Sequence, residues 1–254
     1  MPGSATTSES INMITHAKES RPLLILVGLT VLSLVVLALL PPIPQNQGYH
    51  SFADQRAFLG IPNFWNVVSN LPFVFVGAVG LWQFHRNPTT IVLFGGIFLT
   101  GIGSAYYHWA PSDDTLFWDR LPLTLAFTAA LAAVIEERVD AKLGAILLWP
   151  LLALGVLSLL VWRWTGDLRL YGWVQFFPGV ALPVLLLLCP PKYTGTYYWF
   201  IALGWYVVAK LTEHFDRAIF SVGSIVSGHT IKHLAAAAAC YAILRYFQTR
   251  KPIG

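Results

Sequence analysis

The chain has 254 residues, of which 56% are apolar and 11% are charged, against about 25% charged residues in an average soluble domain. So few charges exclude a soluble globular protein, and the mean hydropathy of +0.62 excludes disorder for most of the chain. The net charge of +4 is scattered without a Lys/Arg run, so no nucleic-acid partner is expected. The composition therefore predicts a multi-pass membrane protein.

Residues 1–20 are polar, and we expect them to form a disordered tail. An apolar segment within residues 21–42 follows and stops at a Pro-Pro pair. A cleaved signal peptide is an alternative, but the apolar run is long for one and no small-x-small cleavage site follows it. We therefore predict an extra N-terminal transmembrane helix.

Residues 50–248 contain seven further segments that are long and apolar enough to span a bilayer. We predict these spans over residues 64–84, 91–109, 116–135, 143–162, 170–188, 197–215 and 229–247. The short connections leave no room for a separate soluble domain. The predicted fold class is an all-α membrane protein, a seven-helix transmembrane bundle with one extra N-terminal helix.

Histidine and aspartate side chains collect at the ends of particular spans. His108 lies at the end of the span predicted over residues 91–109, and Asp119 lies at the start of the span over residues 116–135. His229 and His233 open the last span, over residues 229–247. Counting the crossings places all four at one face of the membrane. Ionisable groups inside membrane spans are costly and are therefore candidates for function.

The spacing of His229 and His233 places both imidazoles on one helical face, where they can bind one metal ion. A third histidine from another helix leaves one position open for water, as in catalytic zinc sites. Zinc lowers the pKa of such a water to about 7. Asp119 could then accept its proton, and the hydroxyl of Ser104, one turn before His108, could stabilise an oxyanion.

Each of these residues also has a simpler interpretation. Ser104 lies in a run of small residues that favours close helix packing, and Asp119 could form an ion pair with Arg120. Five further polar residues of the same face could hydrogen-bond to the metal ligands. The two carboxylates among them, Glu213 and Asp216, could instead form ion pairs with Arg217 and Lys232. The five residues are Asn66, Asn70, Glu213, His214 and Asp216.

The segment SAYYH at 104–108, Asp119 eleven residues later and the segment HTIKH at 229–233 resemble, in this order, the alkaline ceramidase family. This family belongs to a superfamily of seven-helix membrane hydrolases that includes the adiponectin receptors. The segments NFWNVVSN at 63–70 and WDRLP at 118–122 are also similar to it. The resemblance covers about residues 50–245.

The resemblance implies a zinc ion held by His108, His229 and His233. It implies that Asp119 activates or holds the zinc water, and that Ser104 helps to stabilise the tetrahedral intermediate. The implied reaction is hydrolysis of the ceramide amide to a sphingoid base and a fatty acid.

Two features depart from this family. The first helix is additional, and the calcium site of eukaryotic members lacks its glutamate, because Asn63 stands at that position and only Asp54 precedes it. Calcium is therefore not expected. The short loops and the extra helix resemble a bacterial-type member, which implies a bacterial inner (plasma) membrane.

Lys and Arg residues set the expected orientation, since cytoplasmic loops are enriched in them. Nine lie on the face that holds both termini and six on the other, so we expect cytoplasmic termini and the site towards the opposite face.

Three functions remain open. The leading one is a zinc-dependent amide hydrolase that acts on ceramide or a related N-acyl lipid within the bilayer. A receptor-like lipid-binding protein with a mainly structural zinc is the alternative. A b-type cytochrome is less consistent with the pattern, because haem ligands come from facing helices whereas His229 and His233 share one face.

Overall fold

The structure is a computed structural model that describes the backbone of residues 5–253 and the side chains from residue 22 onward. Within these limits the chain forms helices and no β-strand. The long helices are α1 (Ala5–Leu39), α3 (Leu71–Gln83), α4 (Pro88–Trp109), α5 (Asp113–Arg138), α6 (Ala141–Thr165), α7 (Arg169–Leu188), α8 (Tyr197–His214) and α10 (Gly228–Thr249). Short helices are η1 (Gln47–His50), α2 (Phe64–Val68) and α9 (Asp216–Ser221).

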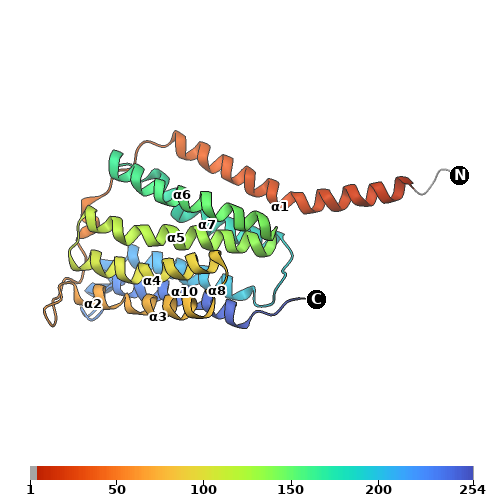
Figure 1. Cartoon of the computed structure of the whole chain (residues 1–254). Coiled ribbons are helices and arrows are strands. Elements are labelled where there is room, and N and C mark those ends of the chain that lie inside the picture. The colour runs from red at the N-terminus through yellow and green to blue at the C-terminus, as the bar shows by residue number, and fades with distance from the viewer. Residues whose placement is uncertain (1–4, 254) are drawn as a thin grey trace.

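The long helices lie side by side as a bundle, with α1 at its edge beside α7 (Figure 1). In the described part of the chain, six spans are long and apolar enough to cross a membrane, with α2 and α3 together forming one of them. Helices α8 and α10 are more polar, because several site residues lie on them, yet they pack against each other within the bundle. The predicted all-α membrane bundle with an additional N-terminal helix is thus confirmed.

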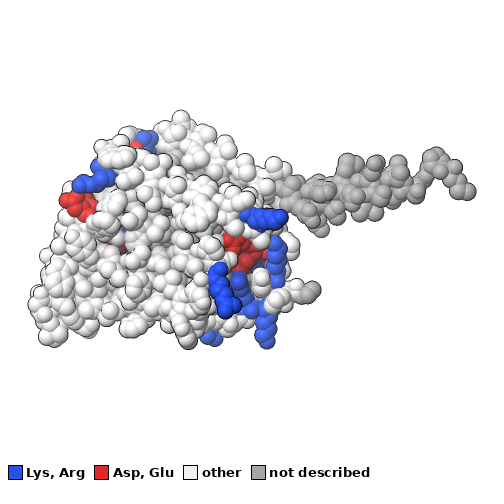
Figure 2. All heavy atoms as spheres, in the orientation of Figure 1, with Lys and Arg blue, Asp and Glu red and all other residues white. Residues whose placement is uncertain are grey.

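Charged side chains gather at the two ends of the bundle (Figure 2). On the face shown, a broad band between these ends is free of Lys, Arg, Asp and Glu. Such a band is what a bilayer core requires, since it offers no water to solvate a charge.

Two elements differ from the predicted boundaries. The helix predicted over residues 64–84 is divided, because Pro72 lacks an N–H and its ring would clash with the carbonyl of Val68, where α2 ends. Helix α1 begins at Ala5, whereas composition predicts a disordered tail over residues 1–20. Neither glycine nor proline interrupts the chain between Ala5 and Arg21. Residues 1–4 of that tail lie outside the described part of the chain.

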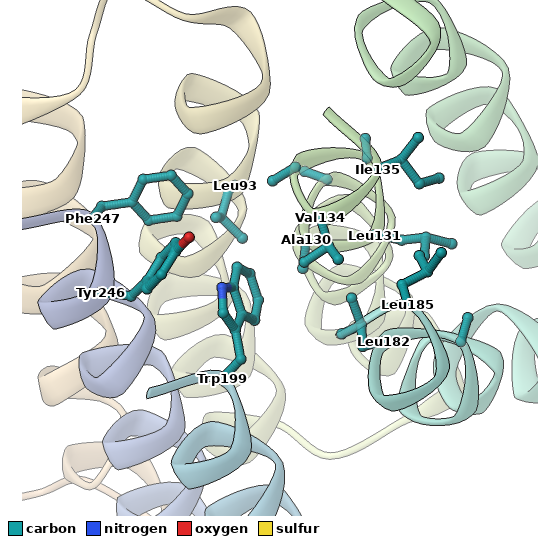
Figure 3. Close-up of a cluster of buried hydrophobic side chains, with 14 of the residues drawn as sticks. Leu93, Ala130, Leu131, Val134, Ile135, Leu182, Leu185, Trp199, Tyr246 and Phe247 are labelled. Carbon is teal, nitrogen blue, oxygen red and sulfur yellow. The ribbon is translucent and has the colours of Figure 1, made fainter. Parts of the chain in front are cut away.

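The main apolar core takes its buried residues from every long helix between α3 and α10 (Figure 3). Trp199, Tyr246 and Phe247 pack together from α8 and α10, and Leu182 of α7 and Ala130 of α5 lie across from them. This packing occupies the end of the bundle at which α5 and α10 finish, and it leaves the polar residues to the opposite end.

Small residues bring α4 close to α5 just before the predicted site. A Cβ atom added to Gly103 would lie 2.1 Å from the backbone carbonyl oxygen of Trp118, whereas one added to Gly95 would meet its nearest neighbour at 3.8 Å. The close approach at Gly103 therefore holds Ser104 and His108 of α4 against the part of α5 that carries Asp119.

We predict that Gly103→Ala lowers the free energy of unfolding by about 1–3 kcal/mol, because α4 and α5 must separate. Thermal unfolding of the purified protein in detergent measures this change. The matched control is Gly95→Ala on the same helix, where the added methyl fits and alanine favours the helix. Equal stability of the two variants would contradict the close approach.

Candidate metal centre

Three histidine rings meet at the polar end of the bundle. His108 comes from the last turn of α4, and His229 and His233 come from the first two turns of α10. The Nε2 atom of His108 lies 3.2 Å from that of His233 and 3.3 Å from that of His229. The three rings are 1%, 4% and 3% exposed, so water surrounds none of them. The three histidines predicted as ligands thus come together, and they could hold a metal ion.

Two of the separations between these nitrogens, 3.2 and 3.3 Å, match tetrahedral zinc, and the three possible ligand atoms all lie within 4.8 Å of one another. With Zn–N bonds of about 2.0–2.1 Å, two nitrogens on one tetrahedral ion lie about 3.3 Å apart. The hydroxyl of Ser69 lies 2.8 Å from Nδ1 of His233. If Nδ1 of His233 donates to Ser69, the lone pair of its Nε2 is free for the ion. The donor set of three neutral imidazoles therefore fits zinc.

Polar contacts at the start of α10 hold its two histidines in place. Ser227 caps the helix by accepting the Thr230 N–H at 3.1 Å. The hydroxyl of Thr230 donates to the side-chain oxygen of buried Asn66 at 3.0 Å. The backbone N–H of His229 donates to the carboxylate of Asp216 at 2.7 Å. Asn66 and Asp216 therefore fix the helix that carries the ligands.

The other residues expected around the ligands have different environments. Glu213 forms an ion pair with Lys232 at 2.6 Å and a second with Lys210, so its carboxylate is engaged by lysines. Asn70 donates to the backbone carbonyl of Asn66 at 2.7 Å and lines the cavity described below. His214 is exposed, with its ring against Phe215, and lies outside the histidine cluster.

The loop before α2 covers the histidines with aromatic side chains that the sequence analysis did not identify. The ring of Phe52 lies 4.6 Å from that of His108 and 4.9 Å from that of His229, between centroids. Tyr49 donates to Glu213 at 3.1 Å. Burial, followed by the charge of Glu213, raises the pKa of Tyr49 well above its ordinary value. Residues outside long helices show no periodic pattern in the sequence, so the position of these aromatic rings over the histidines is seen only in the folded chain.

Asp54, the acidic residue of the same loop, is already paired with a cation. Burial alone would raise the pKa of Asp54, but the hydrogen bonds and charge of Arg56 outweigh it and lower the pKa below its usual value. The two side chains approach to 2.6 Å.

A cavity of about 540 Å³ extends from His233 into the bundle. Its polar end contains six ionisable side chains, and its other end reaches Trp199 and Ile243 between apolar residues. The ionisable residues are Asp119, Arg120, Lys210, Glu213, Lys232 and His233. From Lys232 to Ile243 the wall follows three turns of α10, about 16 Å at the usual helical rise. The cavity therefore matches a lipid, whose head would lie at the polar end and whose tail would lie at the apolar end.

Ser104 and Asp119 are buried and line the polar end of this cavity together with His233. The Ser104 hydroxyl lies within reach of the Asp119 carboxylate. Among the residues with described side chains, Asp119 forms no ion pair with Arg120 within 4.0 Å. The interpretation of Asp119 as half of a surface ion pair therefore does not describe this structure.

The family of the protein follows from comparison with known sequences. The model of the ceramidase family matches residues 58–189, just over half of the chain, and the chain therefore belongs to the ceramidase family. The matched residues include Ser104, His108 and Asp119, whereas His229 and His233 follow them. No curated protein matches the chain. The description of this family denotes hydrolysis of the ceramide amide, and a cavity with one polar and one apolar end agrees with a lipid ligand.

We predict that purified protein carries about one zinc ion per chain and that His229→Ala or His233→Ala loses most of it, because two nitrogens hold the ion poorly. Elemental analysis of each purified variant measures the metal. His214→Ala is the matched control, since this ring lies in the same region but outside the cluster. Full zinc retention in both cluster variants would remove the metal site from these residues.

Proposed function

We propose that this protein is a zinc-dependent hydrolase that cleaves the amide of ceramide or a related N-acyl lipid within the membrane. The observation that carries this proposal is the convergence of three histidines, one of which, His233, lines the polar end of a largely apolar cavity. The products would be a sphingoid base, or another amine, and a free fatty acid.

In this proposal His108, His229 and His233 hold the zinc ion through their Nε2 atoms. A bound zinc ion would polarise the amide carbonyl and lower the pKa of a water molecule. Phe52 and the surrounding helices exclude bulk water from the three rings. Ser69 orients His233, which is the kind of supporting hydrogen bond that sets the affinity of a metal site.

Asp119 is the residue that we assign to the proton transfers. Its carboxylate would accept a proton from the attacking water and return it to the leaving nitrogen, so that the amine departs neutral. Ser104 would donate its hydroxyl hydrogen to the oxygen of the carbonyl as negative charge develops there. Both side chains face the same cavity, which is where the amide of a bound lipid would lie.

The packing of the helices suggests how a lipid enters. Helix α7 packs against α1, α5 and α6, whereas α8 packs against α10, and the cavity lies between these two groups. An acyl chain could therefore pass from the bilayer into the bundle without leaving the apolar phase. A second cavity of about 390 Å³ borders His229 beside Phe52 and Asp216. Water would reach the histidines from this side.

The proposed location is the inner (plasma) membrane of a bacterium, with both termini in the cytoplasm. In Figure 1 the C-terminus lies at the end of the bundle opposite α2 and the start of α10. The site would therefore open towards the face opposite the cytoplasm.

We predict that Asp119→Asn keeps its zinc while turnover falls by about 10²–10⁴, because the amide preserves the size but cannot accept the proton. Zinc content and lipid turnover are measured on the same preparation. The control is Asp114→Asn on the same helix, whose carboxylate is exposed and paired with Arg163. Loss of zinc from Asp119→Asn would make Asp119 a ligand or a structural anchor.

Ser104→Ala should also keep its zinc and lose about 10²–10³ in kcat/KM if its hydroxyl stabilises the developing oxyanion. Ser158→Ala serves as the control, because this buried serine of α6 bonds only to its own helix at Gly155. Full activity of Ser104→Ala would leave Ser104 as a packing residue between α4 and α5.

A further inference from the structure

Arg120 is buried at the polar end of the cavity within a cage of aromatic rings. Its side chain follows Asp119 on α5, and the residue is 6% exposed. The guanidinium carbon lies 4.6 Å from the ring centroid of Trp162, 4.7 Å from that of Tyr171 and 5.7 Å from that of Tyr49. These rings stabilise a cation without neutralising it.

The hydrogen bonds of Arg120 are incomplete. One terminal nitrogen, Nη2, donates to the side-chain oxygen of Gln45 at 2.8 Å. The other, Nη1, is buried and has no hydrogen-bond partner. Among residues with described side chains, no carboxylate lies within 4.0 Å of the guanidinium. The nearby Lys232 differs in this respect, because Glu213 neutralises it.

A buried guanidinium that has no carboxylate within 4.0 Å and lacks a full set of acceptors is unfavourable. Cation–π contacts at three rings offset only part of that cost. The free donor belongs to a side chain that lines the cavity. The missing acceptor is therefore best supplied by whatever occupies the cavity.

We propose that Arg120 binds an anionic oxygen group on the head of the lipid amide, and so selects N-acyl lipids with an acidic head over neutral ones. This inference rests on the proposed function, and it narrows the substrate class from ceramide, whose head is neutral, to related N-acyl lipids with an acidic head. The planar fork of arginine matches a carboxylate or a phosphate, both of which present paired oxygens. Because Arg120 and Asp119 line the same end of the cavity, the acidic group would lie on the same side of the bound lipid as the scissile amide. Gln45, Leu168 and Tyr171 complete this end of the cavity.

The test uses two lipids that differ only in the group meant for Arg120. N-Dodecanoylglycine carries a carboxylate next to its amide, and N-dodecanoylethanolamine carries a neutral alcohol there. Dissociation constants are measured for the zinc-loaded wild-type protein, Arg120→Gln and Arg120→Lys in one neutral detergent. The control is Arg163→Gln, which removes an exposed cation at the same end of the bundle. Dodecanoate is a third ligand, because it represents the carboxylate of the product.

Wild-type protein should bind the glycine conjugate at least about tenfold more tightly than the ethanolamide, because a hydrogen bond to a charged group usually changes a dissociation constant by about this factor. Arg120→Gln should lose this preference with little change for the ethanolamide, and Arg163→Gln should keep it. Arg120→Lys preserves the cation within the cage, so it should fold and keep a reduced preference. If Arg120→Gln does not fold, Arg120→Lys tests the proposal in its place. An Arg120→Lys protein with the wild-type preference for the glycine conjugate would mean that another cation recognises the carboxylate.

Three further results would overturn the proposal. Wild-type protein could bind both lipids equally, Arg120→Gln could weaken both equally, or only dodecanoate could depend on Arg120. Mass spectrometry of the same samples reports cleavage separately. Binding that depends on Arg120 without cleavage would contradict the proposed hydrolase and leave the acidic-head site in place.

Discussion

The meeting of α4 and α10 through three imidazole rings is the contact on which the site depends. Helix α4 packs chiefly against α3 and α5, and α10 packs chiefly against α8 and α3. The two helices share α3 as a neighbour and meet through Phe94 and Phe247, and the histidine nitrogens join them at the polar end of the bundle. Three neutral rings with nitrogens 3.2 and 3.3 Å apart gain little from one another, whereas a shared cation would bind all three.

The arrangement of polarity along the bundle is the second constraint. Burying a charge within a membrane is costly, so the chain concentrates its ionisable side chains at one end of the cavity and leaves the other end apolar. Most of these charges are matched locally, as Lys232 is by Glu213. Arg120 and Asp119 have no ion pair within 4.0 Å among the described side chains, and the position of Arg120 at the polar end connects the charge balance of the site to the head of the lipid.

Much of this organisation can be predicted from the sequence. The apolar segments define the spans, and counting them places His108 on the same face as His229 and His233. Their spacing of four residues then predicts that the last two share a helical face. The break at Pro72 follows from backbone chemistry as well, although hydropathy alone merges α2 and α3.

The remaining features depend on tertiary structure. Tyr49 lies in the short helix η1 and Phe52 in the loop after it, and no pattern in the sequence indicates that this segment folds over the histidines. Local reasoning suggests Arg120 as a partner for its neighbour Asp119. The folded chain instead places its guanidinium among rings from α6, α7 and η1, residues that are distant in sequence.

Hydrolysis by a histidine-bound metal is the central claim, and labelled water tests it most directly. Wild-type protein is stripped of metal, reloaded with zinc and incubated with a lipid amide in water enriched in oxygen-18, and the fatty acid is analysed by mass spectrometry. We expect one labelled oxygen in the released acid, no product from the stripped protein and recovery on addition of zinc. Unchanged lipid in the reloaded sample, with zinc and lipid both bound, would contradict the hydrolase and favour a receptor-like protein with a structural metal.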